Sequence, residues 1–205
     1  MAMMKRCVIA LLGAMWALPG CKAGMYVDIG MGRDFPSHWS KRIHVPGIAR
    51  TYQVDAHLYR GGSPDAEGLA ALKKLGVRTV ISLRSFHDQE AGARKAGLDY
   101  VRIPLNAWEG EIDGEMIRFL QVVADPSRGP FYVHCKRGSD RVGAAVAIYR
   151  ICVCGWTKDE AVREMLAGDF GFLPFWRNLV RYVRQVDAEK LCRAAGLPHR
   201  GGGQE

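Results

Sequence analysis

The stretch FYVHCKRGSDRVG, residues 131–143, places one thiol between an apolar run and a glycine-containing turn. Cys135 stands at the end of the run, and Arg141 follows six residues later. If a strand ends before Cys135 and a helix begins near Val142, the main-chain N–H groups of the turn converge on one point. Such a concavity at a helix N-terminus binds anions through its geometry and through the helix dipole. The same field favours the thiolate of Cys135, which is the nucleophilic form.

Other residues of the turn fit a phosphate ligand. Arg141 supplies a planar, two-pronged donor that matches phosphoryl oxygens. Gly138 and Gly143 permit the tight turn and the close packing of the following helix. A nucleophile, a cradle of donors and a bidentate clamp around one tetrahedral anion amount to covalent phosphoryl transfer. The predicted substrate-binding residues are His134, Lys136, Arg137, Gly138, Ser139, Val142 and Gly143.

Hydrophobic periodicity and turn residues predict the elements that position this loop. The predicted strands are residues 56–60, 77–83, 100–105 and 131–133. The predicted helices are residues 63–76, 87–96, 113–124, 142–153, 157–168 and 175–191. Alternating strands and helices indicate an α/β domain with a mainly parallel central sheet flanked by helices. The loop lies between a strand and a buried helix, at the strand end where such sheets bind ligands.

Composition and length bound the domain organisation. The 205 residues are 48% hydrophobic and 24% charged, which fits one globular domain. We expect that domain over residues 55–192, after an irregular leader over 22–54 and before a flexible tail over 193–205. The net charge of +8 suits anionic partners. The basic residues are scattered and do not interleave with aromatic ones, so no nucleic-acid partner is expected.

Residues 1–21 resemble a bacterial export signal. Lys5 and Arg6 precede an apolar run over 7–18 that is too short to span a bilayer comfortably. The ending Leu-Pro-Gly-Cys resembles a lipoprotein processing site, in which Cys21 receives lipid after cleavage. Its proline departs from the small residue usual there, so secretion without lipid stays open. We expect a periplasmic or exported protein, with membrane anchoring through Cys21 as the further alternative.

The cysteines outside the signal give two alternatives. Cys152 and Cys154 fall in one predicted helix, where residues two apart point in different directions. We expect both to be small buried residues. A disulfide from either of them to Cys192 is the alternative, because an even number of cysteines in an exported protein is typical of disulfides.

The loop also carries a family resemblance. His134 to Arg141 resembles the HCxxGxxR signature of cysteine-based protein tyrosine and dual-specificity phosphatases. Residues 58–64 (LYRGGSP) and 77–83 resemble the opening of small bacterial and plant-type atypical dual-specificity phosphatases, so the resemblance covers about residues 55–187. It implies that Cys135 attacks phosphorus, that Arg141 binds the phosphoryl oxygens, and that water hydrolyses the phosphocysteine without a metal or another cofactor. It also implies that His134 orients the loop.

One residue departs from the family pattern. The family usually has Ser or Thr directly after the arginine, and its hydroxyl helps the thiolate leave when the intermediate breaks down. Val142 cannot supply that hydroxyl. The departure predicts either a slow second step or a phosphate-binding protein with little turnover.

The proton donor has several candidates. It must be a carboxylic acid within hydrogen-bond reach of the bound ester. Asp140 resembles the loop aspartate of a bacterial subset proposed to act on phosphoinositides as well as phosphoproteins, and is the first candidate. Glu109, Glu111 and Asp113 are rivals, because most of the family takes its acid from the loop at this place. Asp113 is equally well placed as a helix cap.

The resemblance implies a phosphorylated protein as substrate, with a phosphorylated inositol or its lipid as the alternative. Lys136 and Arg137 at the rim would widen the preference toward highly charged substrates, or only raise the local potential. Arg84 could reach the site, although a surface ion pair is the simpler expectation. The aromatic stretch 169–176 is expected to pack between two helices rather than to wall the pocket.

Overall fold

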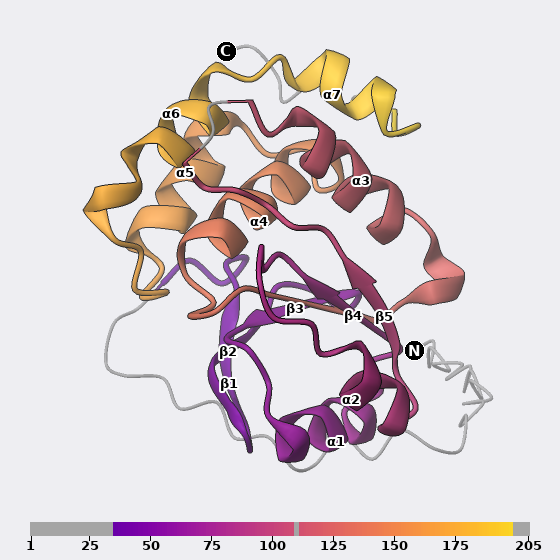
Figure 1. Cartoon of the computed structure of the whole chain (residues 1–205). Coiled ribbons are helices and arrows are strands. Elements are labelled where there is room, and N and C mark those ends of the chain that lie inside the picture. The colour runs from indigo at the N-terminus through magenta and orange to yellow at the C-terminus, as the bar shows by residue number, and fades with distance from the viewer. Residues whose placement is uncertain (1–34, 109–110, 199–205) are drawn as a thin grey trace, which may run out of the picture.

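The computed structural model describes residues 35–108 and 111–198 (Figure 1). The predicted export signal, Cys21, Glu109 and residues 199–205 of the predicted tail lie outside the described residues. Within the described ranges, no helix combines the length and the apolar character needed to cross a membrane.

Six strands form one sheet in the order β1-β2-β3-β6-β4-β5. The strands are β1 (Lys41–Val45), β2 (Ile48–Gln53), β3 (Leu58–Gly61), β4 (Thr79–Ser82), β5 (Asp99–Arg102) and β6 (Phe131–His134). Strands β3, β6, β4 and β5 run parallel, which confirms the predicted mainly parallel sheet. His134 at the end of β6 is in register with Gly61 of β3 and Ser82 of β4. Three strand ends therefore meet where the cysteine loop begins.

The prediction of an irregular leader is wrong for residues 41–53. These residues form an antiparallel hairpin of β1 and β2 that adds to the edge of β3. The turn between the strands contains Gly47 at φ +71°, a left-handed conformation that favours glycine. Ser40, just before the hairpin, donates through its main-chain N and its Oγ to Glu164 Oε1, at 2.6 and 2.8 Å. The folded unit thus includes residues that composition alone assigned to a leader.

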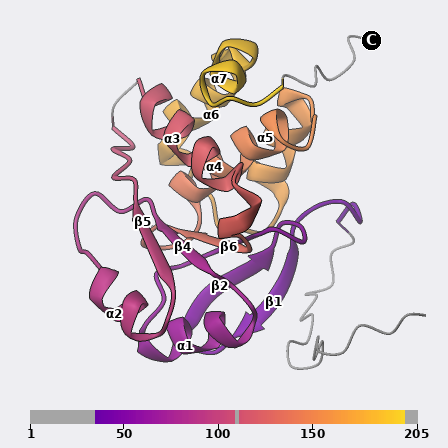
Figure 2. The same ribbon diagram turned by 90° about the vertical axis from the view of Figure 1, so that its right-hand side faces the viewer.

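The helices cover the two faces of the sheet unequally. Figures 1 and 2 show α1 and α2 on one face and α3 to α7 on the other. The helices are α1 (Ala66–Lys74), α2 (Glu90–Lys95), α3 (Asp113–Val123), α4 (Asp140–Cys152), α5 (Lys158–Ala167), α6 (Arg177–Gln185) and α7 (Ala188–Ala194), with 3₁₀ turns η1 (Pro126–Arg128) and η2 (Pro174–Trp176). All residues of α4 from 142 to 152 are buried, as predicted for the helix behind the loop. Its burial fixes the helix N-terminus against the sheet.

The single helix predicted over 175–191 is wrong. The chain forms η2, α6 and α7, with a break at Val186 and Asp187. Val186 takes an extended ψ of 137°, and the Asp187 side chain accepts a hydrogen bond from Lys190 N as the cap of α7. The apolar spacing continues through the break, so periodicity alone did not reveal it, whereas an aspartate cap was a local signal.

After this break, α7 packs against α3 and α4. Cys152 of α4 and Cys192 of α7 form a disulfide, with their Cα atoms 5.6 Å apart. The expectation of a buried free thiol is therefore wrong for Cys152, and the alternative with Cys192 is the one present. Cys154 is a free thiol but is exposed rather than buried, because it lies beyond the end of α4.

Candidate active site

The loop from Cys135 to Ser139 joins the end of β6 to the start of α4. Cys135 is only 3% exposed, and Gly138 N donates to its Sγ at 3.3 Å. This bond aims a main-chain donor at the sulfur. Gly138 takes φ +79°, and a Cβ at this position would collide with the backbone of Gly61 and Gly62. The loop conformation therefore requires glycine there.

The floor of the loop is built by the end of β3 and the residues after it. Ser63 N donates to Lys136 O at 3.2 Å. Arg60 is fully buried, and its Nη2 donates to Gly138 O at 3.1 Å and to Ser139 O at 3.4 Å. Its guanidinium lies 3.9 Å from the ring centre of Phe170. The carbonyls of Lys136, Gly138 and Ser139 thus accept hydrogen bonds from Ser63 and Arg60. The opposite side of the loop is left for its N–H groups, which can point toward a bound anion.

The charge of Arg60 also bears on the loop. Burial lowers the pKa of Arg60 to about 10, so the side chain stays protonated at neutral pH. Its Nε and Nη1 have no hydrogen-bond partner among the described residues. A buried cation beneath the loop stabilises the negative charge of an anion bound there. From the sequence, Arg60 was named only within the stretch 58–64 that resembles the family, and no role was predicted for it. An arginine inside an otherwise apolar strand was the signal for this role.

Arg141 lies at the first turn of α4 and is oriented by the ends of two strands. Its Nη1 donates to Leu83 O at 3.1 Å and to Leu105 O at 3.5 Å. Within the described residues, Nη1 is the one nitrogen of this side chain with a hydrogen bond, so Nε and Nη2 remain for a ligand. This arrangement leaves a two-pronged donor beside the loop.

A pocket of about 360 Å³ opens at this place. Its lining residues are Arg84, Ser85, Phe86, His87, Asn106, Ala107, Trp108, Lys136, Arg141 and Trp176. Arg84 Nη1 donates to Ser63 Oγ at 3.1 Å, so the expected surface ion pair is wrong, and Arg84 is a third basic residue of the pocket. Lys136 lines the pocket, whereas Arg137 is not among its lining residues. The pocket is therefore basic around the loop.

Aromatic side chains form one wall of this pocket. The ring of Trp108 lies 4.9 Å from that of Trp176 and 5.3 Å from that of Phe175, centre to centre. Trp108 and Phe175 are 71% and 66% exposed. The expectation that residues 169–176 only pack in the core is therefore wrong for these rings, although Phe170 is buried beneath Arg60. An apolar wall beside a cationic floor suits a phosphate ester with a ring.

Comparison with known proteins agrees with this geometry. Residues 43–172 match the family described as DSP-PTPase phosphatase fused to NAD+ Kinase. The dual specificity protein phosphatase TpbA of Pseudomonas aeruginosa (strain UCBPP-PA14) is 37% identical over 154 residues, which cover 75% of this chain and 69% of that protein. The chain belongs to the dual-specificity phosphatase family.

Solved structures and a plant relative support the same assignment. The crystal structure of TpbA from P. aeruginosa matches this phosphatase with a TM-score of 0.69 at 34% identity, covering 78% of this chain and 98% of that chain. A cysteine-to-serine variant of TpbA in complex with phosphotyrosine matches with a TM-score of 0.69 at 33% identity, covering 78% and 97%. The inositol diphosphatase DSP5 of Arabidopsis thaliana is 27% identical over 147 residues, covering 67% of this chain and 70% of that protein. The protein is thus a cysteine-dependent phosphatase.

His134 of this phosphatase is fully buried at the end of β6. Its Nδ1 lies 3.2 Å from Cys135 O, and burial lowers the pKa of its imidazole to about 4. At neutral pH the ring is therefore uncharged, and a neutral Nδ1–H can donate to Cys135 O. This contact fits the predicted orienting role.

The buried imidazole predicts a pH dependence of stability. The folded-state pKa lies below the ordinary value of 6.5, so the unfolded chain binds the extra proton. The contribution is complete above pH 6.5 and is lost as the pH falls toward 4. Between pH 7 and pH 4.5 the expected loss is about 2.5 kcal/mol in the free energy of unfolding. Urea unfolding of the wild type and of His134→Asn at pH 7 and pH 4.5 measures it. An equally steep loss in both proteins would contradict the assignment.

The structure places the candidate acids apart. Asp140 is 8% exposed, and its Oδ1 accepts a hydrogen bond from Leu173 N at 2.8 Å. Asp113 is the first residue of α3 rather than its cap, and its Oδ1 accepts from Tyr182 OH at 2.8 Å. Glu111 is exposed, and Glu109 lies outside the described residues. Asp140 is the first residue of α4, directly after the loop, whereas Glu111 and Asp113 follow the pocket residue Trp108 in the chain.

The two residues after Arg141 face the core. Val142 is fully buried in the main hydrophobic core. A Cβ on Gly143 would approach Met165 Cγ to 3.3 Å, so glycine allows the close packing of α4 that the sequence predicted. Among the described residues, no group of three or more His, Cys, Asp or Glu side chains could hold a metal ion.

Proposed function

We propose that this phosphatase hydrolyses phosphomonoesters through a phosphocysteine on Cys135. The Sγ thiolate forms a bond to phosphorus as the ester P–O bond breaks, and the leaving oxygen takes a proton from a carboxylic acid. Water then attacks phosphorus, the S–P bond breaks, and orthophosphate leaves. Arg141 binds the phosphoryl oxygens in both steps. The observation that carries the proposal is Cys135 Sγ under the Gly138 N–H, in a loop that adjoins the Arg141 pocket.

We propose a phosphotyrosine-bearing protein as the substrate class. The relative TpbA has been crystallised with phosphotyrosine, and the Trp108 and Trp176 wall offers rings beside the cationic floor. The test compares kcat/KM for a phosphotyrosine peptide, the matching phosphoserine peptide and an inositol phosphate. We expect the phosphotyrosine peptide to be preferred. Preference for the inositol phosphate would contradict this proposal. It would indicate that the basic residues of the pocket select a phosphorylated inositol, the kind of substrate named for the Arabidopsis relative.

We propose Asp140 as the proton donor. Leu173 N donates to its Oδ1, so its Oδ2 can carry the proton that the leaving oxygen takes. Asp140→Asn keeps an acceptor for that N–H, so the fold is preserved. Hydrolysis of an alkyl phosphate, whose leaving group needs the proton, should fall about 100-fold, and that of p-nitrophenyl phosphate much less. If Glu109→Gln, Glu111→Gln or Asp113→Asn shows this selective loss and Asp140→Asn does not, the acid belongs to the 108–114 loop.

Val142 predicts a slow breakdown of the phosphocysteine. Val142→Thr restores a hydroxyl next to the arginine, and one hydrogen bond to the departing thiolate is worth about tenfold in rate. Rapid-mixing kinetics with p-nitrophenyl phosphate should show a faster steady phase after the burst. Val146→Thr, one turn further along the same buried helix, is the matched control and should not raise the rate. A Val142→Thr rate equal to the wild type would remove the role assigned to this position.

We propose that the protein acts outside the cytoplasm. The signal pattern of residues 1–21 supports this location, and so does the Cys152–Cys192 disulfide, because disulfides persist in oxidising compartments. Fractionation of cells that produce the full chain tests it. Recovery in the periplasm or with the membrane is expected, and recovery in the cytoplasm alone would contradict it.

A further inference from the structure

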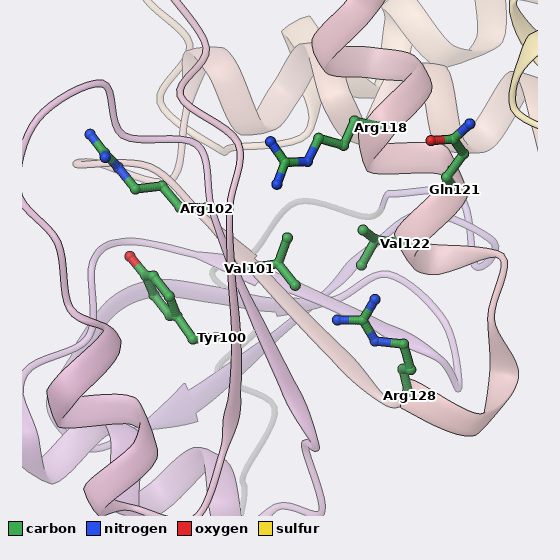
Figure 3. A pocket seen from close by; sticks show the side chains of 7 residues that line it. All are labelled: Tyr100, Val101, Arg102, Arg118, Gln121, Val122 and Arg128. Carbon is green, nitrogen blue, oxygen red and sulfur yellow. The ribbon is translucent and has the colours of Figure 1, made fainter.

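A second basic cavity lies away from the cysteine loop, beside the edge strand β5. Its volume is about 520 Å³. We call it the β5 pocket; its lining residues are Tyr100, Val101, Arg102, Arg118, Gln121, Val122 and Arg128 (Figure 3). They come from β5, α3 and η1, and none of them lines the pocket that contains Arg141. The volume is in the range of sites for small ligands.

Two guanidinium groups, those of Arg118 and Arg128, face this cavity, and no acidic residue lines it. In Figure 3, Arg118 and Arg128 extend from α3 and η1 toward Val101 on β5. In the described part of the chain, neither side chain makes a hydrogen bond or an ion pair. Ser127 Oγ and N donate to Asp125 Oδ1, at 2.6 and 3.0 Å, and these hydrogen bonds are the main cause that lowers the pKa of Asp125; the charge of Arg128 is a smaller cause. The positive charge of the cavity is therefore not neutralised by a carboxylate in its lining.

The third arginine is only partly satisfied. Arg102 Nη2 donates to Ser85 O, whereas its Nε is buried and has no partner among the described residues. In Figure 3, however, the Arg102 side chain extends to the side of β5 opposite Val101, so its guanidinium does not join those of Arg118 and Arg128. Gln121 of α3 adds a side-chain amide to the lining, although its Nε2 also donates to Ala194 O at 3.4 Å.

The open edge of the sheet supplies further donors. Asp99 N donates to Arg78 O and Ile103 N donates to Ser82 O, so both N–H groups face the paired strand β4. Residues of a strand alternate between its two edges, so the N–H groups of Tyr100 and Arg102 face the unpaired edge of β5. Arginine forks and main-chain N–H groups together are the donors that bind phosphate oxygens.

We propose that the β5 pocket is a second anion site, which binds a small ligand with two or more phosphate groups. Two or more groups are required because Arg118 and Arg128 come from two separate elements and one phosphate has oxygens for about one fork pair. The site does not depend on the chemistry at Cys135. Arg102 nevertheless joins the two places, since Ser85 also lines the pocket of Arg141.

The test uses inorganic tripolyphosphate as the probe and amide chemical shifts as the readout. Cys135→Ser serves as the parent protein, so that the probe is not consumed. We expect saturable shifts at Val101, Val122 and Arg128 as well as at the cysteine loop. Arg118→Gln/Arg128→Gln should weaken the first set about tenfold or more and leave the second set unchanged. Arg102 is kept because it holds Ser85.

A matched control separates this site from net charge. Arg163→Gln/Arg193→Gln removes the same charge from exposed positions on α5 and α7, and should leave both sets of shifts in place. Shifts at the cysteine loop alone would overturn the proposal, and so would equal weakening by both double variants. Thermal unfolding of each variant, together with its retained loop shifts, confirms that the protein is folded.

Discussion

Replacing Cys135 by serine is expected to abolish hydrolysis of p-nitrophenyl phosphate while phosphate binding persists. The serine hydroxyl keeps the size of the side chain, but it is not ionised at neutral pH and is a far weaker nucleophile. Removing a covalent nucleophile costs about 10⁴-fold or more in kcat. The binding groups of the loop, Gly138 N and Arg141, are untouched by this change. Steady-state kinetics and calorimetric titration with phosphate measure the two properties separately.

Cys154→Ser is the control for this experiment. Cys154 is the other free cysteine of the described residues, and it is exposed at the far end of α4. Its variant should retain wild-type turnover under reductant. Hydrolysis by Cys135→Ser within tenfold of the wild type, in a preparation free of other phosphatases, would rule out Cys135 as the nucleophile.

Arg141→Lys should lower kcat/KM by about 100-fold or more. A lysine keeps the charge, but it cannot present two parallel N–H donors to phosphoryl oxygens. It also loses the fork geometry in which Nη1 is fixed by Leu83 O and Leu105 O while two nitrogens face the ligand. The loss is expected in kcat as well as in KM, because the developing charge is greatest in the transition state.

The same substitution at an exposed arginine of α5, Arg163→Lys, controls for the change of side chain. It should leave kcat/KM within a factor of about two, as for surface positions away from a site. If Arg141→Lys also stayed within that factor, charge alone rather than a bidentate clamp would explain phosphate binding.

The sequence predicted the loop because local signals and function coincide there. An apolar strand, a glycine turn and a buried helix are each encoded within a few residues of Cys135. Parallel sheet and buried α4 were predictable for the same reason. The hairpin at residues 41–53 was missed because its strands are half-exposed, so their apolar pattern is weak.

Contacts between residues far apart in the chain could not be predicted from the sequence. Arg60 lies 78 residues from Gly138 along the chain, and only the parallel pairing of β3 with β6 places it under the loop. Trp108 and Trp176 meet across a comparable separation to form the pocket wall. The disulfide joins Cys152 and Cys192, which lie 40 residues apart in the chain, and the cysteine count indicated it only as an alternative. The two residues of each contact lie far apart in the chain, so local patterns do not indicate which residues meet.

The central claim, a phosphate bound to Cys135 during turnover, is tested most directly by acid-quenching the wild-type protein with an aryl phosphate and mapping phosphorylation by mass spectrometry. Because Val142 lacks the hydroxyl that speeds breakdown, the intermediate should accumulate, and the peptide containing Cys135 should carry the phosphate. Phosphate on another residue, or turnover at the wild-type rate in the Cys135→Ser variant with no modified cysteine peptide in the wild type, would contradict it.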